Sequence, residues 1–374
     1  MTPPTLRYHN PVDVRFGEGA LQLLPEVLRG RPAVVITFPE AEATGLLPQL
    51  RRLLGPQLRG VLDDVEPNPG VPWVEARYAA FWERHAEAVV VAVGGGSTID
   101  SAKLLLGRTS SGCFAEVLAA MRAGQAPAFV AARPLIAVPT TAGTGSEVTP
   151  WATLWDRTSA VPTKLSLHAE ALWAEVALVD PVLTMTLPDA VTRASALDAL
   201  SHSLEAIWNR NANPISDALA VEAACGLIAA LPRLLNDPRS LLLRREVARC
   251  SLLAGLAFSN TKTALAHSIS YPLTLRFGVP HGIACSFPLP LVWSMAQGSD
   301  PGRDAVLAEV FGPQESNPAG ALRAFLESVG VDCSFTAYGV SPEETAGILR
   351  TAAHGARGQN FINSHLCVNP TTSS

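Results

Sequence analysis

Four residues in the second half of the chain have the types and spacing of a metal site. Asp198 and His202 lie four residues apart in an apolar-periodic stretch, so a helix would place the carboxylate and the imidazole on one face, about one turn apart. His267 and His281 follow later. One carboxylate and three imidazoles suit a divalent transition metal such as Fe²⁺ or Zn²⁺ and disfavour Mg²⁺ and Ca²⁺. Taken singly, each histidine also fits a structural role.

A glycine turn in the first half has the features of a phosphate site. An apolar run at 89–93 leads into Gly94, Gly95, Gly96 and Ser97, and a helical pattern begins at Thr98. Glycines let the backbone approach a ligand, and the free N–H groups and dipole of a helix start favour phosphate. The alternative is a glycine-rich turn without a ligand, because the segment is not a G-x-G-x-x-G fingerprint.

A second loop of small and hydroxyl residues follows the next strand signal. The segment 139–147 reads PTTAGTGSE and comes directly after an apolar run at 135–138. In open α/β sheets, ligands bind at the carboxyl ends of the strands. Two such loops in one sheet suit a dinucleotide better than a single phosphate, although an ordinary Ser/Thr/Gly loop that caps a helix is the alternative.

The elements that would position these residues fall into two groups. Strand patterns at 33–37, 58–65, 88–93, 134–138 and 176–179 alternate with helical patterns, which predicts a doubly wound α/β domain. After Asp180-Pro181 the chain is a series of helical patterns, among them 195–209, 217–231, 241–258 and 305–311. We therefore expect an α/β dinucleotide-binding domain at 1–183 and an all-helical metal- and substrate-binding domain at 184–374.

Composition narrows the class of protein. The 374 residues are 48% hydrophobic and 16% charged, which excludes wholesale disorder. A net charge of −5 without a basic run argues against nucleic acid as a partner. The chain has neither an N-terminal signal-peptide pattern nor about 18 uninterrupted apolar residues, so we expect a cytoplasmic protein with no membrane partner. Six cysteines without a C-x-x-C spacing disfavour a disulfide framework and a cysteine zinc site.

Taken together, the motifs resemble the iron-containing (group III metal-dependent) alcohol dehydrogenase family. They occur in the family's order over roughly residues 8–290: the glycine turn continued as Gly94–Lys103, the 139–147 loop, Asp180-Pro181, Asp198 to His202, His267, and Pro280-His281-Gly282. The resemblance implies a metal ion bound by Asp198, His202, His267 and His281, with NADH or NADPH in the cleft between the domains, and a homodimer. The cofactor residues that it implies are Phe38, Gly94, Gly95, Gly96, Ser97, Asp100, Thr140, Thr141, Thr144, Ser146 and Lys164.

Three positions depart from the family's common pattern. Phe38 stands where many members have an aspartate that holds the adenosine ribose, which leaves both NADH and NADPH open. Tyr271 stands where many have a second histidine near the nicotinamide, which leaves the proton route open. Lys262 stands where the commoner alcohol dehydrogenases have a small or apolar residue, and it is one of only three lysines among 28 basic residues.

The third departure bears on the substrate. The segments around Asn209-Arg210-Asn211 and Thr261-Lys262-Thr263 are similar to the phosphonoacetaldehyde reductase branch of the family. The ammonium of Lys262, five residues before His267, would suit a small aldehyde with an anionic tail, and the planar guanidinium of Arg210 could also bind that tail. A solvated surface role is the alternative for both cations.

The expected reaction is the NAD(P)H-dependent reduction of a short aldehyde, with phosphonoacetaldehyde giving 2-hydroxyethylphosphonate. We expect Tyr271, Lys262 and Arg210 to act in catalysis or substrate binding. Within the family, the alternatives are a dehydrogenase of simple alcohols or lactaldehyde, and a maleylacetate reductase. A lyase similar to dehydroquinate synthase is the alternative from another class.

Overall fold

The computed structural model describes residues 5–364 and divides into two compact units. The sheet unit comprises Pro11–Thr141 and Ser146–Thr186. Among the described residues, the helical unit comprises 5–10, the segment Ala142–Gly145 and 187–364. The chain thus changes unit between Thr186 and Leu187, and the two short segments of the helical unit were not anticipated. The domains expected at 1–183 and 184–374 stay a prediction.

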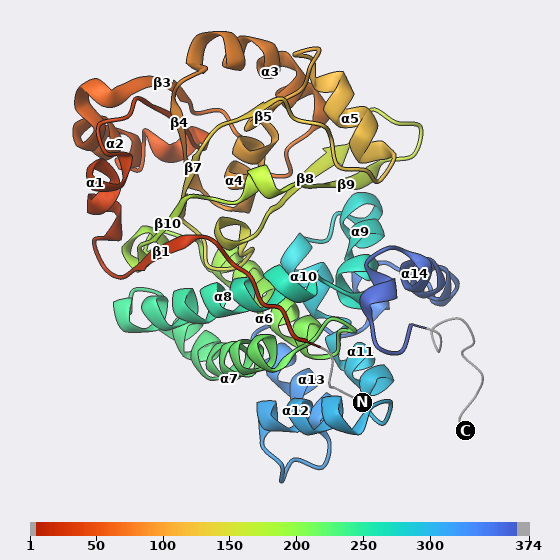
Figure 1. The fold of residues 1–374 in the computed structure, drawn as a ribbon. Helices are drawn as coiled ribbons and strands as arrows, with labels where there is room; N and C mark the ends of the chain where they lie inside the picture. The colour runs from red at the N-terminus through yellow and green to blue at the C-terminus, as the bar shows by residue number, and fades with distance from the viewer. Residues whose placement is uncertain (1–4, 365–374) are drawn as a thin grey trace. The chain divides into compact units, whose positions relative to one another are not determined.

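Six parallel strands form the centre of the sheet unit (Figure 1). Their order is β1-β10-β7-β4-β2-β3, and every neighbouring pair is parallel. The strands are β1 (Asp13–Phe16), β2 (Ala33–Ile36), β3 (Leu58–Leu62), β4 (Val89–Gly94), β7 (Leu135–Pro139) and β10 (Val176–Val179). The other strands form two antiparallel pairs, β5 (Gly107–Arg108) with β6 (Ala131–Ala132) and β8 (Trp151–Asp156) with β9 (Thr163–His168).

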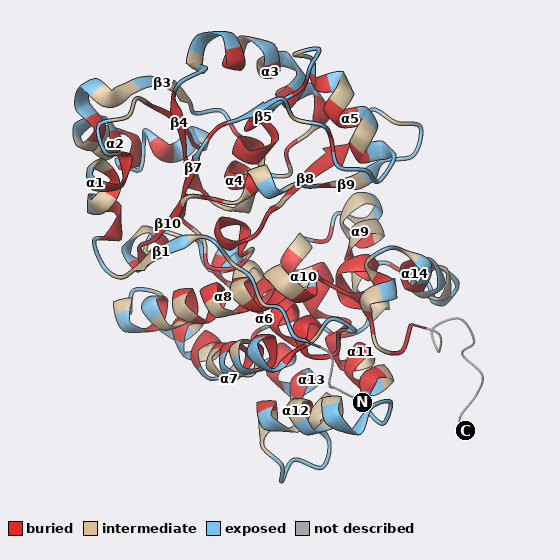
Figure 2. Ribbon diagram, in the orientation of Figure 1, coloured by how far each residue is buried: buried red, intermediate tan, exposed pale blue. Residues whose placement is uncertain are grey.

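Helices cover both faces of this sheet. Alternate residues of the central strands belong to two different cores, as Val90 and Ala92 on one face and Val89 and Val91 on the other illustrate. The first core contains residues of α3 (Val71–His85), α4 (Gly96–Leu104) and α5 (Phe114–Arg122), and the second contains residues of α1 (Leu24–Leu28) and α2 (Leu46–Leu54). Figure 2 shows the sheet buried between these helices. The predicted doubly wound α/β fold is confirmed.

The strand order places the predicted cofactor segments at one edge. From β2 the chain passes outward to β3 and then returns to β4 on the other side of β2, so the direction of winding reverses between β2 and β4. Ligands of open α/β sheets bind beside such a reversal, at the carboxyl ends of the strands. The two strand ends are joined there, because Thr37 Oγ1 donates a hydrogen bond to the Val93 carbonyl at 2.7 Å.

The helical unit contains no named strand in its described part, as the sequence predicts. Its central helix is α6 (Asp189–Ile207), in which every residue from Ala196 to Ile207 is buried. A helix buried on all sides is normally apolar all round, yet this one carries Asp198, His202 and Glu205 into the core. The other helices are α7 (Pro214–Asn236), α8 (Leu241–Thr261), α9 (Leu265–Phe277), α10 (His281–Ser286), α11 (Leu289–Ala296), α12 (Pro301–Phe311), α13 (Pro318–Ser328) and α14 (Pro342–His354).

Among the described residues, only α7 is long and apolar enough to cross a membrane by length and composition. One such helix is weak support for a membrane span, because the core helix of a water-soluble protein passes the same test. Here α7 packs along α6 and α8 within the helical unit.

Candidate functional site

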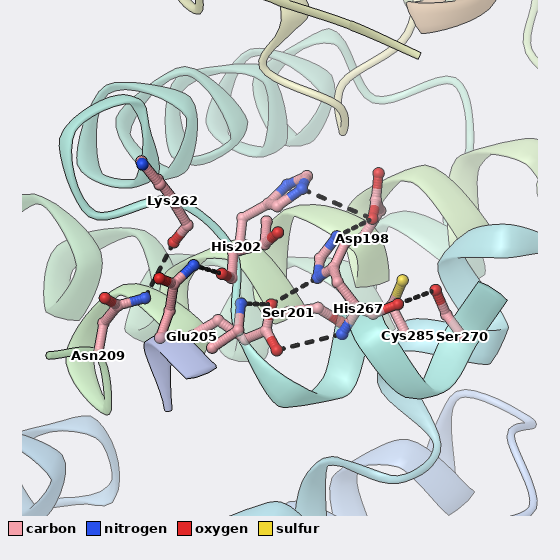
Figure 3. Close-up of polar contacts among 12 residues, drawn as sticks. Asp198, Ser201, His202, Glu205, Asn209, Lys262, His267, Ser270 and Cys285 are labelled. Carbon is pink, nitrogen blue, oxygen red and sulfur yellow. Dashed lines mark hydrogen bonds and ion pairs between the residues drawn. The ribbon is translucent and has the colours of Figure 1, made fainter. Parts of the chain in front are cut away.

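Three of the four predicted metal ligands, Asp198, His267 and His281, converge in the helical unit. Figure 3 shows Asp198 and His267 beside Cys285. One ligand atom each from Asp198, His267 and His281, together with the sulfur of Cys285, all lie within 4.8 Å of one another. Asp198 Oδ1 and His267 Nε2 are 3.4 Å apart, and neither atom forms a hydrogen bond although both are buried. Buried polar atoms without partners are rare in folded proteins. A metal ion would satisfy both atoms, so the residues fit the predicted ion.

Hydrogen bonds orient the three imidazoles in the same way. His267 Nδ1 lies 2.6 Å from Glu205 Oε2, and His202 Nδ1 lies 3.3 Å from the Gly143 carbonyl. His281 Nδ1 lies 3.4 Å from Ser270 Oγ, whose own hydroxyl donates to the His267 carbonyl. Each Nδ1 therefore has an acceptor for its proton, which leaves Nε2 as the ring nitrogen with a lone pair. This tautomer is the one that metal-binding histidines commonly use.

The charge states of the cluster suit a cation. Burial alone would raise the pKa of Asp198, but His202 and His267 beside it hold that pKa well below the usual range, so the carboxylate is ionised. Burial lowers the pKa of His202 to about 4, so its imidazole is neutral at neutral pH. Burial also disfavours a proton on His267, yet the adjacent Cys285 and Glu205 raise its pKa. A positive charge is thus favoured at the place where a metal ion would lie.

His202, the fourth predicted ligand, lies beside the cluster. Its ring stacks on Phe258 at a centroid distance of 4.1 Å and on His267 at 4.6 Å. Its Nε2 is 3.9 Å from Asp198 Oδ1. The place of His202 among the ligands stays a prediction.

The glycine turn of the sheet unit fits a dinucleotide phosphate. Strand β4 ends at Gly94, and α4 starts directly after Gly95. A Cβ on Gly94 would lie 2.3 Å from Thr98 Oγ1, and one on Gly95 would lie 3.2 Å from the Thr141 side chain. Glycine at both positions avoids these contacts and leaves the backbone of the turn uncovered by side chains, as a phosphate site requires. The Thr140 N–H donates to the Gly94 carbonyl, so the two predicted cofactor loops are in direct contact.

A buried lysine holds these loops together. Lys103 Nζ donates to the carbonyls of Ser146, Thr149 and Trp151 at 2.5–2.8 Å. Asp100 accepts from Ser146 Oγ at 2.6 Å and from the Thr153 N–H at 2.9 Å. Two of the predicted cofactor residues, Asp100 and Ser146, thus bond to each other.

Comparisons with known proteins agree with this geometry. A sequence profile of iron-containing alcohol dehydrogenases matches residues 11–181, and one of the C-terminal domain of Fe-containing alcohol dehydrogenases matches residues 192–365. Long-chain-alcohol dehydrogenase 1 of Geobacillus thermodenitrificans is 33% identical over 356 residues, which are 91% of this chain and 88% of that protein. The chain belongs to the iron-containing alcohol dehydrogenase family.

Other members extend the comparison. The 1,3-propanediol dehydrogenase of Klebsiella pneumoniae is 31% identical over 79% of this chain and 77% of its own length. The structure of sulfoacetaldehyde reductase from Bifidobacterium kashiwanohense in complex with NAD⁺ matches with a TM-score of 0.87 and 28% identity, covering 98% of this chain and 97% of that one. The chain is therefore an alcohol or aldehyde oxidoreductase of the kind that uses NAD(H) and a metal. The lyase alternative loses its support, because the matching profiles and relatives are oxidoreductases.

The remaining residues expected to bind the cofactor of this alcohol dehydrogenase are dispersed over both units. Phe38 follows β2 and packs partly against the second core of the sheet. Lys164 lies on β9, with its ammonium 5.3 Å from the ring centre of Trp155. Thr144 belongs to the Ala142–Gly145 segment of the helical unit, whereas Thr140, Thr141 and Ser146 belong to the sheet unit.

The two segments expected to bind the substrate lie side by side in the helical unit. Asn209 Nδ2 donates to the Lys262 carbonyl, and Asn211 Nδ2 donates to the Thr261 carbonyl, each at 3.1 Å. The Lys262 side chain is exposed, and in Figure 3 its ammonium points away from Asp198. The Arg210 guanidinium donates to Ser364 Oγ at 2.8 Å. Tyr271, four residues after His267 on α9, is half-buried.

Sequence reasoning missed Glu205 and Cys285. Glu205 is fully buried and accepts hydrogen bonds from the Ala264 N–H, the His267 N–H and His267 Nδ1. It follows Asp198 by seven residues, so the spacing Asp-x₃-His-x₂-Glu on one helix face could have revealed it. Cys285 follows His281 by four residues on α10. The sequence disfavours a cysteine zinc site because it contains no C-x-x-C spacing, and that expectation stays a prediction. The structure adds that the Cys285 sulfur lies within 4.8 Å of the ligand atoms of Asp198, His267 and His281.

Proposed function

We propose that this enzyme reduces a short aldehyde with an anionic tail, and that phosphonoacetaldehyde is the preferred substrate and 2-hydroxyethylphosphonate the product. The observation that carries the reaction class is the cluster of Asp198, His267 and His281, in which two buried atoms form no hydrogen bond, in a chain of this family. When bound, the metal would polarise the aldehyde carbonyl and the dihydronicotinamide would supply the hydride. The same proposal includes Fe²⁺ or Zn²⁺ as the metal and NADH or NADPH as the cofactor. It also includes a homodimer and a cytoplasmic location.

The backbone conformation of Lys262 supports the proposal that the substrate has an anionic tail. Its φ of 68° and ψ of 171° lie in a region that is essentially restricted to glycine. A lysine in that conformation costs about 1–3 kcal/mol, and a glycine would remove the cost. Residues in such conformations cluster at functional sites, which supports a functional role for Lys262. The exposed ammonium has four rotatable bonds with which to reach an anion. The sulfoacetaldehyde reductase among the similar structures is, by its name, an enzyme for an aldehyde with an anionic tail.

Two variants of Lys262 test this proposal. Lys262→Gly should lower kcat/KM for phosphonoacetaldehyde about 10- to 150-fold, because a charge-assisted hydrogen bond is worth about 1.5–3 kcal/mol. The same variant should leave kcat/KM for propanal nearly unchanged and should unfold at a higher urea concentration. Lys262→Ala should lose the anion contact but retain the backbone strain. Arg239→Ala, at an exposed position between α7 and α8, is the matched control.

The assay compares phosphonoacetaldehyde, sulfoacetaldehyde and propanal with NADH and with NADPH. An equal loss on all three aldehydes would mean that Lys262 does not recognise the tail. Several relatives are named for uncharged alcohols, including 1,3-propanediol. A wild-type preference for propanal over both anionic aldehydes would therefore favour a simple alcohol dehydrogenase.

A further inference from the structure

We propose that three asparagines, Asn209, Asn211 and Asn360, are positioning residues that hold Lys262 in place to bind the anionic tail of the substrate. These three residues are called the asparagine clamp below. The inference rests on the proposed function, because it explains what keeps the tail-binding lysine in its strained conformation. It goes beyond that function by assigning part of the substrate specificity to residues that act through Lys262.

The side-chain amides of the clamp bind three consecutive backbone carbonyls. Each amide nitrogen donates to a different carbonyl, namely Asn211 to Thr261 and Asn209 to Lys262, each at 3.1 Å, and Asn360 to Thr263 at 2.8 Å. Figure 3 shows the middle one of these hydrogen bonds, between Asn209 and the Lys262 carbonyl. Lys262 therefore lies at the centre of a segment that side chains hold on both sides.

The clamp comes from two segments that are far apart in the sequence. Asn209 and Asn211 follow α6, and Asn360 ends a short 3-10 helix at 358–360. The two segments are joined, because the Arg210 N–H donates to the Asn360 carbonyl at 2.8 Å. Asn209 Oδ1 accepts from the Asn211 N–H at 3.0 Å and from Asn211 Nδ2 at 3.2 Å. These bonds occupy the amide oxygen of Asn209, so its nitrogen is the atom that faces Lys262.

Lys262 needs this support because its backbone is strained. Its φ of 68° and ψ of 171° are conformations that residues other than glycine keep only where the surrounding structure over-determines them. The N–H groups on either side of the clamped carbonyls are also bound. The Lys262 N–H donates to the Phe258 carbonyl at 2.8 Å, and the Ala264 N–H donates to Glu205 Oε2 at 2.8 Å. Hydrogen bonds thus fix both ends of this segment.

The clamped segment connects Lys262 to the metal cluster. Glu205, which accepts the Ala264 N–H, also lies 2.6 Å from His267 Nδ1. One buried carboxylate therefore fixes the end of the segment and the imidazole of a predicted metal ligand. The Lys262 side chain thus starts from a fixed place relative to His267. A site that is ordered before binding loses less conformational freedom when the ligand arrives, so it binds more tightly.

Steady-state kinetics of a double clamp variant test this inference. Asn211→Ala/Asn360→Ala removes two amide donors and keeps the buried Asn209. Its KM for phosphonoacetaldehyde should rise about 5- to 30-fold, because fixing the backbone of one residue costs about 1–2 kcal/mol and about 1.4 kcal/mol is a factor of ten. The tail contact exists in the ground state and in the transition state alike, so kcat should stay nearly unchanged. Both constants for propanal should also stay nearly unchanged.

The matched control is Asn317→Ala. Asn317 is an exposed asparagine that caps α13, where its Oδ1 accepts from the Gly320 N–H at 3.0 Å. Its loss should lower the urea concentration at which the protein unfolds and leave both KM values unchanged. Each single clamp variant should raise the KM for phosphonoacetaldehyde less than the double variant does. A rise of this KM in Asn317→Ala equal to that in the double variant would mean that lower stability alone causes it, and would overturn the inference.

Repeating the double substitution in Lys262→Gly shows whether the clamp acts through Lys262. There it should no longer raise the KM for phosphonoacetaldehyde, because no ammonium remains to be positioned. An equal rise with and without Lys262 would overturn the inference. Equal losses on phosphonoacetaldehyde and propanal would overturn it as well, because the asparagines would then support only the fold or the metal cluster.

The outcomes separate this inference from the proposed function. A wild type that prefers phosphonoacetaldehyde to propanal, loses that preference in Lys262→Gly and keeps it in the double clamp variant would refute the clamp and leave the proposed function intact. A wild type without a preference for anionic aldehydes would refute both.

Discussion

The buried carboxylate Glu205 offers the sharpest test of the metal centre, through the substitution Glu205→Gln. Its Oε2 accepts from the Ala264 N–H at 2.8 Å and from His267 Nδ1 at 2.6 Å, and its Oε1 accepts from the His267 N–H at 3.1 Å. A glutamine presents an oxygen on only one side. If that oxygen keeps the two bonds of Oε2, the new NH₂ group faces the His267 N–H, and two donors oppose each other.

The expected losses of stability and of metal affinity follow from these three hydrogen bonds. One buried N–H is left without an acceptor, which costs about 1–3 kcal/mol of folding free energy. The loss of negative charge beside His267 also weakens that histidine as a ligand. Carboxylates that hold a metal-binding histidine in this way contribute about 10- to 100-fold to metal affinity. We therefore expect Glu205→Gln to bind zinc about 10- to 100-fold more weakly than the wild type.

Two measurements separate affinity from folding. Competition with a chromophoric chelator gives the zinc dissociation constant, and urea unfolding of the metal-free protein gives the stability. Glu222→Gln is the control, because Glu222 is a largely exposed glutamate that pairs with Arg249. If Glu205→Gln binds zinc as tightly as the wild type while the metal-free protein is destabilised, Glu205 supports only the fold, and the assignment of His267 as an oriented ligand is wrong.

Three further predictions concern the cofactor turn, a buried acid and the proton donor. Gly95→Val should raise the KM for NAD(H) at least about 10-fold and barely change that for the aldehyde, because the added side chain meets Thr141; the reverse pattern in steady-state kinetics would contradict the site. Burial raises the pKa of Glu147 from 4.5 to about 7, so the free energy of unfolding should fall as pH rises through that window. Urea titrations at pH 5 and pH 7.5 should show that Glu147→Gln removes this part of the slope, and an identical slope would refute it. Tyr271→Phe should lower kcat about 100-fold or more with KM unchanged if the phenol donates the proton, whereas an unchanged kcat would mean that the proton comes from another group.

The sequence predicts the central strands because burial on both faces makes them continuous apolar runs. Strand β4 is apolar from Val89 to Val93, and all six of its residues are buried. The edge strand β1 reads DVRF and is half-exposed, so it lacks that signal. The hairpin β8–β9 mixes apolar, charged and hydroxyl residues for the same reason. The central strands are thus readable from local hydrophobicity, and so is the edge strand β3, whereas β1 and the β8–β9 hairpin are not.

Local sequence spacing also predicts only part of the metal cluster. The pair Asp198 and His202 is visible in the sequence because four residues make one helical turn, but that spacing fixes only a face of α6. Which neighbours complete the site depends on how α9 and α10 pack against it. Gly282 lets α10 approach α6 closely, and Gly143 does the same for the segment 142–145, because a Cβ on either would lie 2.5 Å or less from an α6 carbonyl oxygen. Contacts between distant segments bring His267 of α9 to Glu205 and His281 of α10 to Asp198, and no local spacing shows them. The sequence shows which residues could bind a metal ion. The packing of distant segments determines which of them lie close enough to bind the same ion.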